Sequence, residues 1–230
     1  GFLWDGAAMQ DLGTLQDVVG SSDSLDINNA GEVTGSSDAP GGAYHAFLSD
    51  GTSMQDLGTL GGYYAMGRAI NSWGQVAGNS AIAGDVYTHA FLWTGTTMLD
   101  LGTLGGTSSY ATAINDSGEV TGWASKINEG QHAFLWDGTT MVDLDPEGVG
   151  SEANAINNAG QVTGFALSGG QHAFLWDGTA MRDLNTLIDP ADPLQPSVWL
   201  KNGNDINEHG QILANGVDRL TGEARAYLVS

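Results

Sequence analysis

Short apolar runs recur along the chain at regular intervals, and each run has the length of one β-strand. The pattern His-Ala-Phe-Leu-Trp, or a looser variant, occurs six times, and its central aromatic residue recurs every 40 to 53 residues. These residues are Phe2, Phe47, Phe91, Phe134, Phe174 and Tyr227. Both parities of the run are apolar, which predicts strands that are covered on both faces. The internal period predicts an array of one repeated structural unit.

A first hairpin is predicted in each repeat by the pattern Ala-Ile-Asn-x-x-Gly-(Glu/Gln)-Val-x-Gly. Asn followed three residues later by Gly is typical of a type I turn closed by a residue with positive φ, which glycine adopts without strain. We expect strand, turn and strand at 27–35, 70–78, 114–122, 156–164 and 206–214. The asparagines, expected to be structural, are Asn28, Asn71, Asn115, Asn157 and Asn207.

A second hairpin is predicted where two alternating apolar runs flank an Asp-Gly turn. These turns lie at Asp5-Gly6, Asp50-Gly51, Asp137-Gly138 and Asp177-Gly178, with Thr94-Gly95 as the departure. The run after the turn has the form Met-x-Asp-Leu. Its aspartates, also expected to be structural, are Asp11, Asp56, Asp100, Asp143 and Asp183.

Four short strands in each repeat, with no helical period, predict an all-β fold of the β-propeller kind. Five first hairpins predict about five four-stranded blades in one domain over 1–230. The blades are expected at 24–57, 66–101, 110–144, 153–184 and 203–229. The segment 2–12 is expected to complete the last blade, so that the ring closes between the N- and C-terminal strands and leaves no free edge. Six blades remain an alternative if an upstream half-blade is missing.

The charge balance narrows the range of partners. Six Lys and Arg residues against 27 Asp and Glu residues give a net charge of −21, which repels phosphate backbones and excludes nucleic acid. A solubilising surface, adaptation to salt and cation binding remain open as reasons for the acidity. No apolar stretch approaches the roughly 20 residues that span a bilayer, so we expect no membrane insertion. The absence of Cys excludes a disulfide framework and a thiolate metal site.

The motifs H-A-F-L-W-D-G-T-T-M-x-D-L-G-T-L-G-G and A-I-N-x-x-G-x-V-T-G-x-A resemble those of the bacterial HAF repeat family, named for its His-Ala-Phe triplet. The resemblance covers nearly all of the chain, with degenerate copies at Gly1-Phe2 and at Arg225-Ala226-Tyr227. It implies an exported or cell-surface repeat protein and supplies no catalytic residues. The chain begins without an initiator Met or a secretion signal, which is typical of a processed product.

Four histidines occupy the same position in successive repeats: His45, His89, His132 and His172. Four histidines that met on a ring axis could ligate a transition metal. They begin the third strand of each blade, however, whereas the innermost strand lines the channel. We therefore expect structural hydrogen bonds to the repeated aspartates or to neighbouring backbone, similar to those of WD40 blades, and no metal.

Two of the five repeated aspartates could form a catalytic carboxylate pair. The two carboxylates of a catalytic pair need different pKa values and therefore different surroundings, whereas equivalent repeat positions are expected to have similar surroundings. We therefore expect these side chains to cap turns or loops. Loops rich in oxygen ligands, 23–29 and 115–116, leave calcium open as a cofactor, although neither has EF-hand spacing. No nucleophile-elbow, zinc-protease or phosphate-loop motif is present, and no other cofactor is indicated.

Function on a repeated ring is expected where the blades differ. The candidate binding residues are Tyr63, Tyr64, Arg68, Trp73, Tyr87, Tyr110, Trp123 and Trp199. Exposed aromatic rings among Asn, Asp and Gly are typical of a sugar-binding surface, because a ring face stacks on a pyranose. Alternatively, most of these rings pack under loops or between blades. The insertion 187–199 is the largest break in the repeat, and we expect an ordered loop there.

Three functions remain. The favoured one is a non-enzymatic, extracellular or cell-surface scaffold or binding module whose partner is a glycan or a protein. The alternatives are a lectin-like carbohydrate binder and a glycan-cleaving enzyme of the five-bladed propeller kind. Fold alone cannot choose among them.

Overall fold

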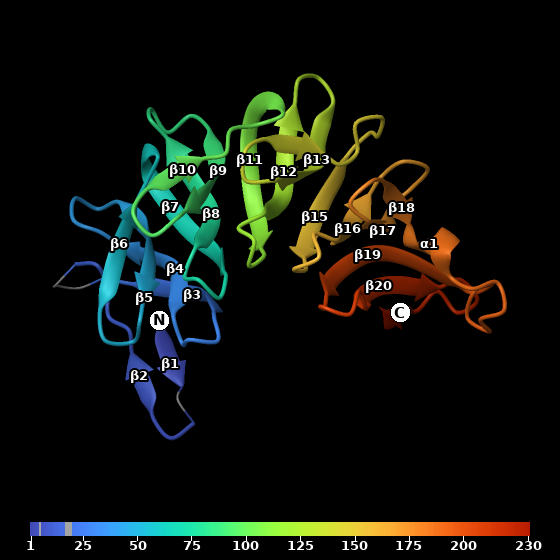
Figure 1. The fold of residues 1–230 in the computed structure, drawn as a ribbon, viewed down its shortest axis with the longest axis horizontal. Coiled ribbons are helices and arrows are strands. Elements are labelled where there is room, and N and C mark those ends of the chain that lie inside the picture. Colours follow the sequence, from blue (N-terminus) through green and yellow to red (C-terminus); the bar gives the residue numbers. More distant parts are fainter. Residues whose placement is uncertain (5, 17–19) are drawn as a thin grey trace. The chain divides into compact units, whose positions relative to one another are not determined.

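The computed structural model describes residues 1–4, 6–16 and 20–230, which form strands β1 to β21 and one four-residue helix (Figure 1). Asp5, of the first expected Asp-Gly turn, lies outside the described residues. The chain divides into two compact units, one of Gly1–Thr103 with Thr107–Gly118 and one of Leu104–Gly106 with Glu119–Ser230. The helix in the described part of the chain is far too short to cross a lipid bilayer.

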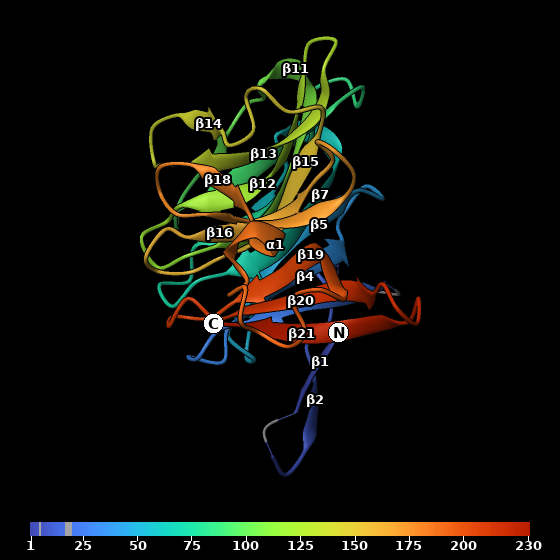
Figure 2. The same cartoon turned by 90° about the vertical axis from the view of Figure 1, so that its right-hand side faces the viewer.

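The first unit contains a hairpin followed by two antiparallel four-stranded meanders. The hairpin pairs β1 (Phe2–Trp4) with β2 (Met9–Asp11) and extends away from the next sheet (Figures 1 and 2). The first meander is β3 (Ser22–Ile27), β4 (Val33–Asp38), β5 (Tyr44–Ser49) and β6 (Met54–Gly58). The second is β7 (Gly61–Ile70), β8 (Val76–Ile82), β9 (Thr88–Trp93) and β10 (Met98–Asp100). A parallel pair of Tyr44 in β5 with Tyr64 in β7 joins the two meanders into one eight-stranded sheet. Most of β11 (Gly105–Ile114) also belongs to this unit.

The second unit continues the same pattern. It contains β12 (Val120–Lys126), β13 (Gly130–Trp136) and β14 (Met141–Asp143), then the meander β15 (Ser151–Ile156), β16 (Val162–Ala166), β17 (His172–Trp176) and β18 (Met181–Asp183). Helix α1 (Leu184–Leu187) precedes β19 (Val198–Ile206), β20 (Ile212–Asp218) and β21 (Ala224–Val229). These last strands form a three-stranded sheet with β21 at its edge (Figure 2).

The turns predicted from the sequence are confirmed. In the first hairpins Gly31, Gly74, Gly118, Gly160 and Gly210 have φ between 72° and 83°. Each donates its N–H to the carbonyl of the asparagine three residues earlier. In the second hairpins Asp50, Asp137 and Asp177 accept backbone N–H groups from the two residues after the glycine. Local turn chemistry therefore sets the period of the strands.

The core of each complete repeat is a phenylalanine that lies opposite a glycine. Phe47, Phe91, Phe134 and Phe174 are fully buried. Gly35, Gly78 and Gly164 are three of the glycines paired with them. A Cβ at any of these three would collide with a backbone carbonyl of the first strand of its sheet. The Val-x-Gly pattern thus reflects close packing between first strand, glycine and ring.

Asparagine side chains join successive repeats. Asn71 Nδ2 donates to Asn115 O at 3.0 Å, and the same bond links Asn28 to Asn71 at 3.0 Å and Asn157 to Asn207 at 3.1 Å. Each of these asparagines also accepts backbone N–H groups of its own turn through Oδ1. One side chain therefore holds both its own hairpin and the next repeat.

The all-β class predicted from the sequence is confirmed, and two local features differ from the prediction. Strands β7 and β11 begin at residues 61 and 105, earlier than the predicted blade boundaries at 66 and 110, because both strands extend back through a Gly-Gly pair. In β7 a register shift follows. Helix α1 was not predicted, and Asp183 caps it by accepting from Asn185 N. Within the described residues β2 pairs with β1 and β21 with β20. Blade number, single-domain organisation and ring closure stay predictions.

Candidate functional site

Three of the repeated histidines bind the repeated aspartates. His45 Nδ1 lies 2.8 Å from Asp56 Oδ1, and His89 Nδ1 lies 2.9 Å from Asp100 Oδ1. His132 Nδ1 lies 3.1 Å from Asp143 Oδ2, with the histidine fully buried. An ionised carboxylate only accepts, so Nδ1 carries the proton in each pair. The fourth histidine, His172, has the backbone partner that was the alternative, Gly170 O at 2.9 Å.

The repeated aspartates also cap the loops that follow them. In all five, Oδ1 accepts the backbone N–H two residues ahead, at distances from 2.7 to 3.0 Å. The same oxygens therefore serve both a histidine and a loop in three repeats. These carboxylates have the structural bonds expected from the sequence.

Metal ligation was the alternative role for the histidines, and calcium for the Asp-rich loops. Among the described residues no three His, Asp or Glu side chains gather as a metal centre would require. The expectation of a loop at 23–29 is wrong in part, because residues 23–27 belong to strand β3. Asp26 Oδ2 in this strand accepts from Ile70 N at 2.8 Å, and Asp116 Oδ1 accepts from Ser72 N at 3.0 Å. These carboxylates are engaged with backbone groups of neighbouring strands and turns.

The third repeat adds a cation to the His–Asp pair. Lys126 Nζ lies 2.6 Å from Glu129 Oε2 and 3.3 Å from Asp143 Oδ2, and it donates to Pro146 O at 3.1 Å. The Glu129 hydrogen bond is the largest of the effects that raise the pKa of Lys126. Burial raises the pKa of Asp145, which stands where three other repeats have glycine and one has Asn185. Lys126, Glu129 and Asp143 thus pair with one another beside His132, whereas His132 Nε2 and Asp145 Oδ2 are buried without a hydrogen-bond partner within the described part of the chain.

The candidate aromatic residues of the first unit fall into separate groups along β7. At the start of β7, Tyr63 contacts Tyr44 edge to face, with ring centroids 6.4 Å apart. The Tyr63 hydroxyl donates to Gly42 O, and its N–H donates to Asp85 Oδ1. Tyr87 follows in the same β8–β9 connection and is 43% exposed.

A second group lies further along β7. Tyr64 donates its hydroxyl to Met66 Sδ at 3.3 Å. Burial is the main cause of the raised pKa of Tyr64, while Arg68 lowers it and Tyr110 raises it. Arg68 and Tyr110 thus both act on the Tyr64 hydroxyl, and of the three residues only Arg68 is well exposed.

Trp73 stands alone at the opposite end of β7, in the turn before β8. Its side chain is 76% exposed. Its indole Nε1 donates to Asp116 O at 3.1 Å, which fixes the ring while leaving its face in water. The equivalent positions in other repeats hold Ala30, Ser117, Ala159 and His209. The turn itself therefore does not need a large apolar side chain here.

The two candidates in the second unit are partly buried. Trp199 Nε1 donates to Gln171 O at 2.9 Å, and the Arg219 guanidinium lies 4.4 Å from its ring centroid. Trp123 is half-buried in the middle of β12, opposite Ala133. These two rings match the packing alternative stated for the aromatic residues.

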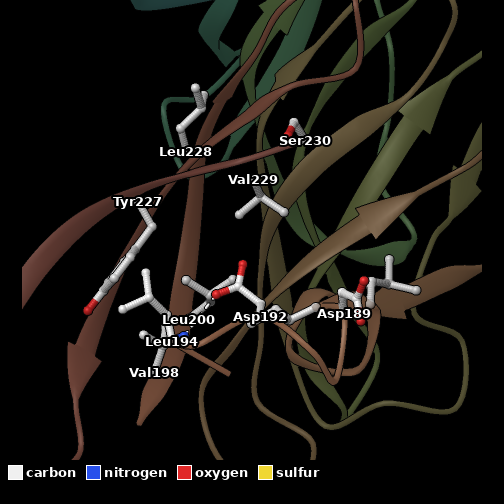
Figure 3. A pocket seen from close by; sticks show the side chains of 11 residues that line it. Asp189, Asp192, Leu194, Val198, Leu200, Tyr227, Leu228, Val229 and Ser230 are labelled. Atoms are coloured by element: carbon white, nitrogen blue, oxygen red, sulfur yellow. Dashed lines mark hydrogen bonds between the residues drawn. The ribbon is translucent and has the colours of Figure 1, made fainter. Parts of the chain in front are cut away.

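An apolar pocket of about 180 Å³ lies between the 187–199 insertion and β21 (Figure 3). Tyr227 and Val229 face it from β21, with Leu200 from β19 and Leu194 from the insertion, while Leu228 points away. Asp189 and Asp192 also line it. The insertion, expected as an ordered loop over one face, forms one wall of this pocket.

The chain is similar to the β-propeller domain of the Trilobed protease from Pyrococcus furiosus, described as having an open velcro topology, with a TM-score of 0.56 and 12% identity. The match covers 90% of this chain and 64% of that domain, so the chain spans about two thirds of its length. The fold is that of a β-propeller.

Two further solved structures are similar at a lower level. Pyrococcus horikoshii acylaminoacyl peptidase has a TM-score of 0.45 and 16% identity, over 81% of this chain and 29% of that one. The SapL1 lectin in complex with α-methyl fucoside has a TM-score of 0.36 and 12% identity, over 91% and 80%. Neither reaches the similarity that supports a conclusion. No family model and no curated protein matches the sequence.

The sequence analysis did not find the residues that contact or hydrogen-bond these aromatic side chains. Tyr44 contacts Tyr63, Asp116 fixes Trp73, and Arg219 covers Trp199. Tyr44 could have been found, because the other repeats have Thr88, Gln131 and Gln171 before the histidine. Asp116 and Arg219 carry no such signal, since their roles depend on contacts between distant segments.

Proposed function

We propose that this chain is a non-enzymatic binding module whose ligand contacts centre on Trp73. The observation that carries the proposal is the exposed and fixed indole of Trp73 at a turn position that is otherwise small or polar. A ring held by its N–H loses little conformational freedom on binding, so more of the stacking energy appears as affinity.

The rest of the repeat chemistry supports binding rather than catalysis. The repeated aspartates cap loops, and three of them also hold histidines. Asp56, Asp100 and Asp143 differ in exposure, but each carboxylate is held by a histidine and a loop N–H of its own repeat. The repeated aspartates and histidines thus have structural roles.

A neutral glycan is the ligand class that best fits the surroundings of Trp73. A pyranose stacks on an exposed indole face, and short polar side chains such as those of Ser72 and Ser117 can bond its hydroxyls. The net charge of −21 disfavours uronate or sulfated glycans. An extracellular or cell-surface location, implied by the HAF repeat resemblance, belongs to the same proposal.

A glycan array followed by calorimetry tests this function. We expect binding of a neutral glycan by the native chain and a loss of about tenfold or more with Trp73→Ala, the equivalent of about 1.4 kcal/mol. Trp4→Ala is the matched control, because Trp4 is also an exposed tryptophan of the first unit, at 59%. No binding at millimolar glycan, or equal binding by Trp73→Ala, would overturn the proposal.

A further inference from the structure

A second pocket lies in the second unit, at the end of the sheet where β15 begins and β16 ends. It has a volume of about 300 Å³, and its lining includes Val149, Glu152, Phe165 and Leu167 together with residues 130–131 of the β12–β13 turn. This volume is at the lower end of the roughly 300–1,000 Å³ that is typical of pockets for drug-sized ligands. The pocket therefore suits a single side chain better than an oligosaccharide.

Two lining residues, Glu152 and Phe165, are directly opposed in the antiparallel pair of β15 and β16. Opposed residues point to the same face of a sheet with Cβ atoms about 5 Å apart, so a carboxylate and an aromatic ring lie side by side here. Both side chains are partly exposed. The other repeats have different pairs at these two positions: Asp23 and Ser36, Met66 and Asn79, Tyr110 and Trp123, and Asn202 and Asn215. The repeat itself therefore does not require this pair.

The carboxylate of Glu152 has no hydrogen-bond or ion-pair partner within the described part of the chain. Burial is the cause that raises its pKa, and no cation offsets that effect. In the same unit Lys126, Arg182 and Arg225 each lie against a different carboxylate. A partly buried carboxylate without a partner is less stable than one in water, because the charge loses hydration. A cation supplied by a ligand would offset this cost.

Exposed apolar side chains flank this carboxylate. Val149 is 68% exposed and Leu167 is 43% exposed, and Leu167 N donates to Gly150 O at 2.9 Å. A carboxylate beside apolar surface fits a side chain with an aliphatic stem and a cationic end. The planar guanidinium of arginine can in addition stack on an aromatic ring and bond both carboxylate oxygens. The net charge of −21 also attracts a basic partner.

We propose that this pocket binds an arginine side chain of a basic partner protein. The guanidinium pairs with the Glu152 carboxylate and stacks on the Phe165 ring, while the aliphatic stem and its apolar neighbours lie on Val149 and Leu167. The exposed apolar rim favours a protein segment over a small free cation, because it gives the residues next to the arginine a surface to cover. Trp73 belongs to the first unit and does not line this pocket, so the two proposals are independent.

Calorimetry with two short peptides tests this proposal. One peptide has a central arginine between leucines, and the other has citrulline, which keeps the shape but is neutral. We expect the native chain to bind the arginine peptide about tenfold more tightly or better, the ratio that a charge-assisted hydrogen bond supports. Glu152→Gln should remove this preference, whereas Trp73→Ala should keep it. Equal affinities of the native chain for the two peptides would overturn the proposal.

Two further variants separate the pocket from general attraction to an acidic surface. Glu147→Gln is the matched control, because Glu147 is exposed two residues before Val149 and does not line the pocket. It should keep the preference for arginine, and a loss equal to that of Glu152→Gln would overturn the proposal. Phe165→Leu should weaken binding of the arginine peptide by about two- to fivefold, the range of an exposed cation–π contact. A glucosamine oligomer that binds through Glu152 while the arginine peptide does not would assign the pocket to a cationic glycan and overturn the protein partner.

Discussion

His132 is fully buried and its Nδ1 lies 3.1 Å from Asp143 Oδ2, whereas the equivalent pair of His45 and Asp56 is partly exposed. Asp143 also interacts with Lys126, at 3.3 Å. The same two residue types at the same repeat position thus stand in different environments. We expect the His–Asp pair to contribute more to the free energy of unfolding where it is more buried.

Removing the buried carboxylate of Asp143 should lower the free energy of unfolding more than removing the exposed carboxylate of Asp56. Asp143→Ala leaves the buried imidazole N–H of His132 without its acceptor and removes one of the two carboxylates beside Lys126, so we expect a loss of about 2–4 kcal/mol in the free energy of unfolding. Asp56→Ala, the matched control, should lose about 1 kcal/mol or less. Urea denaturation at neutral pH measures both. Equal losses would contradict the assignment.

The asparagine that joins two repeats should matter more than one that serves only its own turn. Asn71 is buried and bonds Asn115 O, Gln75 and two backbone N–H groups, so Asn71→Ala should lose about 2–3 kcal/mol. Asn207 is exposed, and its side chain bonds only within its own turn among the described contacts, although its carbonyl accepts from Asn157. Asn207→Ala should lose about 1 kcal/mol. Thermal and urea unfolding of the two variants give the comparison.

The glycine beneath Phe174 should not tolerate a side chain. A Cβ at Gly164 would collide with Glu152 O and Ala153 Cα, so Gly164→Ala forces a shift of the first strand. We expect a loss of about 3 kcal/mol. Gly178→Ala is the control, with open space around its Cβ but a φ of 91°, and should lose about 1–2 kcal/mol. A milder effect at Gly164 than at Gly178 would show that the strand is not closely packed there.

Acid should weaken the Asp-Gly turns. Hydrogen bonds from Thr139 Oγ1 and then from the Thr140 and Thr139 N–H groups lower the pKa of Asp137 from 3.8 to about 2. The folded-state pKa is below the unfolded one, so this stability is present above about pH 4 and is lost as pH falls toward 2. Bonds led by Ser53 N lower the pKa of Asp50 to about 2 in the same way.

Replacing these carboxylates with a neutral acceptor tests the linkage. The double variant Asp50→Asn, Asp137→Asn should be less stable than the native chain near neutral pH, and this difference should shrink as the pH falls below about 4. Melting temperatures across that interval measure it. Parallel curves for the two proteins at all pH values would exclude a contribution from these turns.

Much of the local structure could be predicted because it depends on neighbours in the sequence. Asn71 and Gly74 specify a turn, and Asp137 with Gly138 specifies another, from residues within a few positions of each other. The histidines could be assigned to the repeated aspartates since both lie one hairpin apart. The early start of β7 was missed, because Gly61 and Gly62 are as typical of a loop as of a bulged strand.

The sequence by itself determined the all-β class, the strand and turn period, and the structural bonds within each repeat, because these depend on residues in one hairpin. Only the tertiary structure decided that Trp73 is exposed and fixed by Asp116, that Trp199 is covered by Arg219, and that β21 has an open edge beside an apolar pocket. Those features depend on contacts between segments that are distant along the chain. Aromatic residues that look equivalent in the sequence therefore lie either in packed positions or on the exposed surface.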